Sequence, residues 1–174
     1  MATQKELLRR KKKRWLPIYA TKQFNNVEIG ETLTSEPSSL IGKNVSISLM
    51  NLTQDIKSQN TKITFKIKES KNDRLDTDLV RYELSSFSLK RMVHKDKDKI
   101  DDSFKATTKD NVGIRIKPFI VTKSSTKRSV LTSLKKKSQE LLAEAIKKAD
   151  YDSFLEEVIR FKIQSAIKRE LSKI

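Results

Sequence analysis

The 174-residue sequence contains no cysteine, three glycines, three prolines and one histidine, and only 6% of its residues are aromatic. Without cysteine, neither disulfides nor thiolate metal sites form, which suits a reducing compartment. No GxxxxGK phosphate loop occurs, and three glycines cannot supply a dinucleotide-binding fingerprint. No apolar run approaches the roughly 18 residues that span a bilayer, and the basic start lacks the apolar segment of a secretory signal. We therefore expect a soluble intracellular protein with no membrane partner and no cofactor.

Catalytic and metal-binding groups are equally scarce. His94 lies in the charged string RMVHKDKDKIDD, and nothing in the sequence assigns it the nucleophile and orienting carboxylate that a catalytic histidine needs. Asp96, Asp98, Asp101 and Asp102 resemble a cation loop only superficially, because the EF-hand glycine and final glutamate are missing and lysines interleave. We expect no metal site and no enzyme activity.

Positive charge is what the sequence has in excess. It carries 38 basic and 22 acidic residues, a net charge of +16, with 36% hydrophobic residues. Such an imbalance opposes compaction by self-repulsion and favours a polyanionic partner, of which nucleic acid is the leading candidate. An anionic membrane surface is a distant second.

The charge is also unevenly placed. The first 14 residues contain seven cations and one acid, residues 123–137 contain six cations and no acid, whereas residues 28–55 contain four acids and one lysine. This polarity indicates one face that meets phosphates, with serine and threonine hydroxyls adding neutral hydrogen bonds. The helix lysines Lys147 and Lys148 are better explained as a solubilising face. The candidate RNA-binding residues are Arg9, Arg10, Lys11, Lys12, Lys13, Arg14, Trp15, Arg115, Lys117, Lys123, Lys127, Arg128 and Lys135.

Period-two alternation runs through residues 24–122. It is clearest in NVSISL, KITFKIKE and VGIRIKP, and it predicts antiparallel strands with one apolar face. TTKDN (107–111) predicts a hairpin turn, SEPSSLIG (35–42) a turn-rich link with a helical turn after Pro37, and LSSFSLKRMV (84–93) a short helix.

Residues 126–174 change to the helical period. Val130, Leu134, Leu141, Ala145 and Ala149 form one stripe, and a second amphipathic helix is expected to run on to the end. Ser153 and Glu156 have capping-box spacing at its start. The predicted fold is α+β: a basic RNA-binding arm (1–16), an antiparallel barrel-like β-rich core (17–125) and a C-terminal helical region packed on that core (126–174).

The kind of nucleic acid follows from what is missing. No zinc finger, RNP aromatic set or GXXG loop occurs, and aromatic residues are too few for base stacking to be the main binding mode. Binding to the backbone and shape of structured RNA fits best. Trp15 either stacks on a base or pins the arm to the protein's own core, and the residues leave both readings open.

Several strings, in order along the chain, resemble one family. KKKRWLPIYA, NNVEIGET, LIGKNVSISLMNLTQD, TKITFKIKE, TDLVRYEL, ATTKDNVGIRIKP, STKRSVLTSLKK and DYDSF are similar to segments of the S3Ae family of archaeal and eukaryotic small-subunit ribosomal proteins. The resemblance covers residues 11 to 172. It departs from the family at Gln54, where a glycine is usual, and at HKDKDK (94–99), where the family is richer in arginine.

The resemblance implies a structural constituent of the small ribosomal subunit with an archaeal-type length, located in the cytoplasm. Its implied partners are small-subunit ribosomal RNA at the platform, neighbouring ribosomal proteins such as S-eleven, and messenger RNA or initiation factors nearby, with no homo-oligomer. The alternative is a non-ribosomal nucleic-acid-binding protein, such as an RNA chaperone or chromosomal factor.

Overall fold

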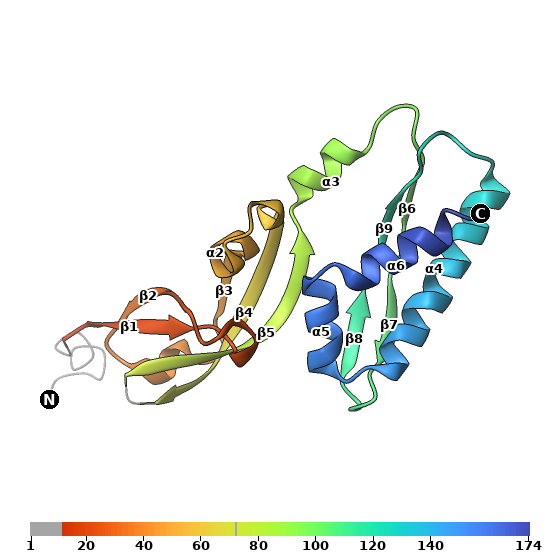
Figure 1. The fold of residues 1–174 in the computed structure, drawn as a ribbon. Helices are drawn as coiled ribbons and strands as arrows, with labels where there is room; N and C mark the ends of the chain where they lie inside the picture. Colours follow the sequence, from red (N-terminus) through yellow and green to blue (C-terminus); the bar gives the residue numbers. More distant parts are fainter. Residues whose placement is uncertain (1–11, 72) are drawn as a thin grey trace, which may run out of the picture. The chain divides into compact units, whose positions relative to one another are not determined.

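The structure, a computed structural model, describes residues 12–71 and 73–174 (Figure 1). The chain forms two compact units, the first running to Leu89 and the second from Lys90 to Ile174. The boundary lies inside a short helix, α3 (Ser86–Met92), whereas the hydropathy pattern placed the end of the β-rich core at residue 125. Alternation locates strands but does not say which strands share a core, and this is why the two positions differ.

A five-stranded, nearly closed barrel-like sheet makes up most of the first unit. Its strands, in the spatial order β2-β1-β5-β4-β3, are β1 (Arg14–Tyr19), β2 (Glu28–Thr34), β3 (Asn44–Ser48), β4 (Thr61–Lys71) and β5 (Arg74–Leu84). Neighbouring strands are antiparallel except β1 and β5, which are parallel. Register shifts in the β1–β2 and β4–β5 pairs bend the sheet, since bulges increase twist and curvature. The predicted α+β class with a barrel-like core is confirmed.

The core of this unit follows the predicted alternation. Ile63 and Phe65 are 0% exposed, whereas Lys62 before them and Lys66 after them are exposed. Thr64 breaks the rule: it is buried, and its hydroxyl pairs with that of Ser46 at 2.9 Å. Leu49 was expected at the end of a strand but instead begins α2 (Leu49–Thr53), where it is fully buried.

Short helices connect the strands. They are η1 (Lys22–Phe24), η2 (Pro37–Leu40), α2 and η3 (Ile56–Ser58), and the helical turn after Pro37 and the helix in LSSFSLKRMV are confirmed. Gln54 ends α2 with φ 56°, in the left-handed region that favours glycine. The backbone therefore keeps a glycine-type turn at the position where this sequence departs from the family.

The second unit is a hairpin covered by three helices (Figure 1). Its strands are β6 (Lys99–Asp101) paired with β9 (Phe119–Val121), and β7 (Phe104–Thr107) paired with β8 (Gly113–Ile116), so the predicted turn at TTKDN is confirmed. The helices are α4 (Arg128–Lys148), α5 (Tyr151–Ile159) and α6 (Lys162–Leu171). Ile146 of α4, 0% exposed, is the most deeply buried residue of the cluster in which Phe154 and Ile163 join it from α5 and α6.

Two helix boundaries differ from the sequence predictions. The last amphipathic segment is not one helix, because Phe161 adopts φ 57° and separates α5 from α6. No glycine or proline marks this break; the turn lets Phe154 and Ile163, from opposite sides of it, enter the same apolar cluster. The capping box at Ser153 is also wrong: α5 starts at Tyr151, whose amide donates to the carboxylate of Asp110 at 3.0 Å.

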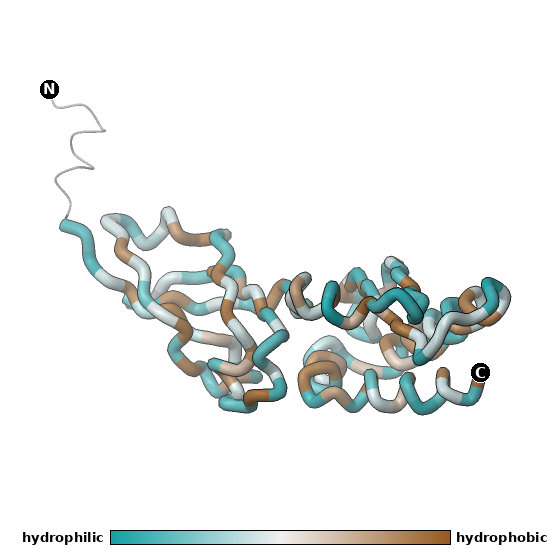
Figure 2. Tube along the Cα trace, turned by 90° about the horizontal axis from the view of Figure 1, so that it is seen from above, coloured by the Kyte–Doolittle hydropathy of each residue, from teal (hydrophilic) through white to brown (hydrophobic). Residues whose placement is uncertain are grey.

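Figure 2 shows hydrophilic and hydrophobic residues interspersed along the Cα trace of each unit. Among the described residues, none of the helices combines the length and the hydropathy that crossing a membrane demands.

Candidate nucleic-acid interface

The hairpin of the second unit is a single two-stranded ribbon with a short interruption. Asp101 pairs with Phe119 and Phe104 pairs with Ile116, so both ladders keep one register. Between them, the amide of Asp102 donates to the Pro118 carbonyl at 3.4 Å. Proline has no amide proton to return the bond, which explains the gap in the ladder.

Because successive strand residues point to opposite faces, the shared register sorts the ribbon into two faces. The inward face is apolar and packs against α4, α5 and α6. Its members in contact with the helix clusters are Ile100, Phe104, Ala106, Ile114, Ile116 and Ile120. The opposite face is therefore held outward by the packing of the first.

Cations dominate the outward face next to the turn. Lys105 and Arg115 are directly paired across the two strands, and Lys117 follows Arg115 by two residues on the same face. All three are exposed, and no described carboxylate lies within ion-pair distance of them. We call Lys105, Arg115 and Lys117 the ribbon cations. Sequence reasoning proposed Arg115 and Lys117 but missed Lys105, although the predicted hairpin around TTKDN already places Lys105 opposite Arg115.

Asp102 is the one acidic side chain on the inward face. It is 8% exposed, lies 3.2 Å from Nζ of Lys135 and accepts a hydrogen bond from Nε2 of Gln139, both on α4. Burial alone would raise the pKa of Asp102, but hydrogen bonds from the Ser103 amide, Lys135 and Gln139, together with the charge of Lys135, outweigh it, so the pKa is lowered. Lys135, proposed from the sequence as an RNA contact, thus has its charge matched within the fold.

A second exposed basic group lies between β9 and the start of α4. The carboxylate of Asp98 accepts hydrogen bonds from the Thr126 amide at 2.7 Å and the Ser125 hydroxyl at 3.3 Å. The amide of Asp98 also donates a hydrogen bond to the Thr122 hydroxyl oxygen at 2.9 Å. These bonds fix the segment 122–127, which presents the exposed side chains Lys123 and Lys127, followed by Arg128.

The first turn of α4 has no acidic residue and no side-chain cap from Lys127. Helix N-termini carry a partial positive charge, and Lys127 and Arg128 add to it; the Asp98 carboxylate, which accepts from the Thr126 amide, offsets part of this charge. A phosphate bound beside segment 122–127 and the first turn of α4 would therefore reduce the electrostatic repulsion there. We call Lys123, Lys127 and Arg128 the α4 cations.

The basic start of the chain is only partly described. Arg9, Arg10 and Lys11 lie outside the described residues, while Lys12 and Lys13 are exposed and precede β1. Arg14 already belongs to β1 and lies 2.7 Å from Asp73, with both side chains about half exposed. Arg14, Trp15 and Leu16, assigned to the arm from sequence, are therefore the first residues of the sheet.

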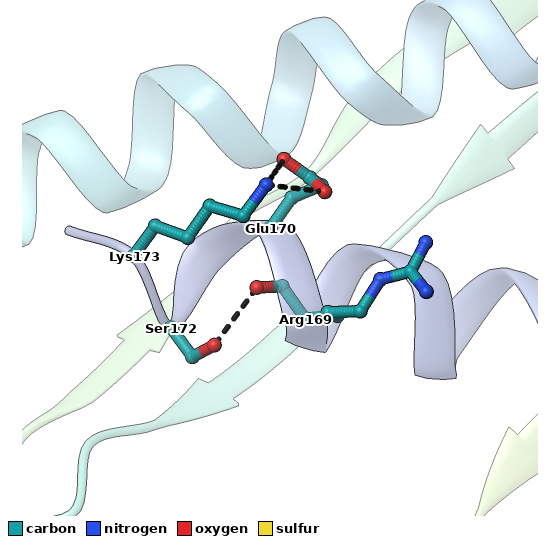
Figure 3. A network of polar contacts seen from close by, with 4 residues as sticks. All are labelled: Arg169, Glu170, Ser172 and Lys173. Carbon is teal, nitrogen blue, oxygen red and sulfur yellow. Dashed lines mark hydrogen bonds and ion pairs between the residues drawn. The ribbon is translucent and has the colours of Figure 1, made fainter.

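At the C-terminal end, Lys173 and Glu170 form an ion pair (Figure 3). Nζ of Lys173 lies 2.9 and 2.8 Å from the two carboxylate oxygens of Glu170, and the Ser172 hydroxyl donates to the Arg169 carbonyl at 2.8 Å. The hydrogen bond and the charge of Lys173 lower the pKa of Glu170. Lys173 is therefore a weaker candidate for phosphate than the ribbon cations.

No group of three or more histidine or acidic side chains gathers within residues 12–71 and 73–174 in a way that could hold a metal ion. His94 is exposed in the loop after α3. The features that remain are a barrel-like sheet, a helix-backed ribbon and exposed cations, and together they define the class of basic α+β proteins suited to a polyanion.

Comparison with known proteins identifies the family. Residues 3–174 match the model of the Ribosomal S3Ae family. The chain is 31% identical over 158 residues to small ribosomal subunit protein eS1 of Halorubrum lacusprofundi, covering 91% of this chain and 74% of the relative. It is 28% identical over 166 residues to the protein of that name from Haloarcula marismortui (95% and 78%) and 30% over 164 residues to that of Saccharolobus islandicus (94% and 79%). The chain belongs to the Ribosomal S3Ae family.

Proposed function

We propose that this protein is a structural constituent of the small ribosomal subunit that binds ribosomal RNA at the platform and so supports translation. Family membership along nearly the whole chain supports the ribosomal role. The observation that carries RNA binding is the ribbon: its apolar face is occupied by helices, and its other face offers exposed cations without acidic partners among the described residues.

The proposed phosphate-binding set comprises the ribbon cations, the α4 cations and the basic arm. Arg9, Arg10, Lys11, Lys12 and Lys13 form the arm's contribution, and Arg14, the first residue of β1, adds to it although the exposed Asp73 lies 2.7 Å away. Each cation that neutralises a phosphate releases condensed counterions, and this release supplies a large share of protein–nucleic acid affinity. Lys135 is left out of the set, because Asp102 holds it.

The ribbon favours contact with the phosphate backbone over reading of bases. Outward residues of a strand recur about every 7 Å, so paired strands place cations on a small grid that meets several phosphates at once. The deep, narrow major groove of A-form RNA is closed to side chains, whereas its backbone is accessible. Neighbouring ribosomal proteins, with S-eleven expected from the family resemblance, and nearby messenger RNA or initiation factors complete the proposed surroundings.

Salt-dependent binding of the full chain to small-subunit ribosomal RNA tests this proposal. For the variant K105Q/R115Q/K117Q we expect the slope of log K against log salt to fall in magnitude by about two to three, since each phosphate contact contributes roughly 0.7 to 0.9. The control K147Q/K148Q/K168Q removes the same charge from exposed helix positions and should change the slope by less than one contact.

Wild-type protein that fails to bind the RNA at low salt would contradict the proposed function. Equal losses in the two triple variants would show that binding follows net charge alone, and the ribbon would then have no special role.

A further inference from the structure

The environment of Trp15, the only tryptophan, differs from that of Tyr19, the other aromatic residue on β1. Leu16 and Ile18 face the core with 1% and 4% exposure, so Trp15 lies on the opposite face of the strand, where it is 64% exposed. It therefore does not pin the arm to the core of this unit. Its cross-strand partner on β2 is Leu33, itself 44% exposed.

Tyr19 lies further along the same face of β1, and its ring, unlike that of Trp15, has a cationic partner. The guanidinium of Arg74 lies 3.8 Å from the centre of the Tyr19 ring. No ring stacking and no cation–π contact with Trp15 occurs among the described residues. An exposed indole leaves a large apolar surface in water, so a ligand that covers the ring gains from burying that surface.

The charges around Trp15 indicate what that ligand is. Lys12 and Lys13 immediately precede the strand, are exposed and have no described acidic partner. Glu31 of β2 is paired with Pro17 of β1, so it lies on the side of Trp15 away from the two lysines. An aromatic ring beside cations is the combination that binds unpaired nucleotides, with the base on the ring and the phosphates on the cations. Interface cores between proteins, in contrast, are depleted of lysine.

We infer that Trp15 is a stacking site for one unpaired RNA base, whose flanking phosphates lie toward Lys12 and Lys13 and away from Glu31. The base must be unpaired because bases within a duplex are already stacked on their neighbours and present only their edges. The strand holds the indole on a rigid base, which limits the entropy lost on binding. This inference rests on the proposed RNA-binding function and adds a single-stranded subsite to the phosphate contacts.

The test uses the full chain and Trp15 fluorescence, which reports this one position. An oligouridylate of about ten nucleotides, within the usual site size for single strands, should quench the fluorescence and shield the indole from acrylamide. A blunt RNA duplex with the same number of phosphates should bind through the cations and leave the indole accessible.

Two substitutions distinguish stacking by the aromatic ring from simple burial of apolar area. Trp15→Leu should weaken oligouridylate binding by about 5- to 150-fold, the usual loss for one stacked base, while Trp15→Phe should retain most of the affinity. Leu33→Ala is the matched control on the neighbouring strand, and its affinity should stay near wild type.

The outcomes separate the inference from the function on which it rests. If ribosomal RNA binds with the expected salt dependence but Trp15 fluorescence and the affinity of Trp15→Leu do not change, the stacking site is wrong and the proposed function stands. If neither ribosomal RNA nor oligouridylate binds at low salt, the proposed function itself fails. Quenching by RNA-free small-subunit proteins, without quenching by oligouridylate, would assign Trp15 to a protein interface and overturn the inference.

Discussion

Replacing Asp102 tests how the ribbon is fixed to its helices. In Asp102→Ala the carboxylate that accepts from Lys135, Gln139 and the Ser103 amide is lost from a site that is only 8% exposed. Hydrogen bonds to a charged group contribute about 1.5–3 kcal/mol each. Lys135 is 45% exposed and regains water, so part of this energy is recovered. We expect a loss of about 2–4 kcal/mol in the free energy of unfolding.

Two further variants separate charge from shape. Asp102→Asn keeps an acceptor for Gln139 but removes the charge, and it should cost about half as much as the alanine variant. Asp101→Asn is the matched control, because Asp101 is the adjacent residue, 57% exposed, and its ion pair with Lys99 at 3.2 Å is a surface pair. Such pairs contribute about 0–1 kcal/mol.

The pKa of Asp102 also sets a pH dependence. Because this pKa is lowered in the folded protein, ionised Asp102 stabilises the fold above the ordinary aspartate pKa of about 3.9, and the contribution disappears as pH falls through the lower folded value. The stability gap between wild type and Asp102→Asn should therefore be full at neutral pH and narrow in acid.

Urea unfolding followed by far-ultraviolet circular dichroism measures these differences, since α4, α5 and α6 are the longest helices described and all lie in the second unit. Trp15 fluorescence reports the first unit in the same samples. An Asp102→Ala protein as stable as Asp101→Asn, or a gap that widens in acid, would refute the account of this contact.

Three other substitutions, one of them with a matched control, test the same structure. Ile146→Ala removes a side chain with 0% exposure and should cost about 2–5 kcal/mol in urea unfolding, whereas Ala143→Gly, also on α4 but only partly buried, should cost about 1 kcal/mol; equal losses would contradict the packing described. Asp98→Ala removes the acceptor of the Thr126 amide and should raise hydrogen exchange at that amide while α4 stays protected; unchanged exchange would show that the bond does not hold the segment. Lys173→Ala breaks only an exposed ion pair with Glu170, so its unfolding midpoint should match wild type, and a clear drop would be unexpected.

Much of the fold could be predicted from the sequence, because its signals are local. Alternation in KITFKIKE and the turn residues of TTKDN fixed strands and a hairpin, and both depend only on neighbouring residues. The break at Phe161 could not be found in this way, since a phenylalanine in the left-handed region gives no composition signal. It arises from tertiary packing of helices on either side.

The candidate site was predicted unevenly for the same reason. Runs of lysine and arginine are visible in one dimension, but whether a given lysine is free depends on what lies opposite it in space. Lys105 became a candidate phosphate contact because strand pairing places it beside Arg115. Lys135 ceased to be one because its charge is matched by the inward-facing Asp102. The face of β1 that Trp15 occupies became clear only from the burial of its neighbour Leu16.

The most direct test of the proposed role is to sediment lysate of the source organism through a moderate-salt sucrose gradient and detect this chain. We expect the chain to travel with small ribosomal subunits, in a fixed ratio to their RNA. Recovery only in the free-protein fractions would contradict it and would favour a nucleic-acid-binding protein that acts outside the ribosome.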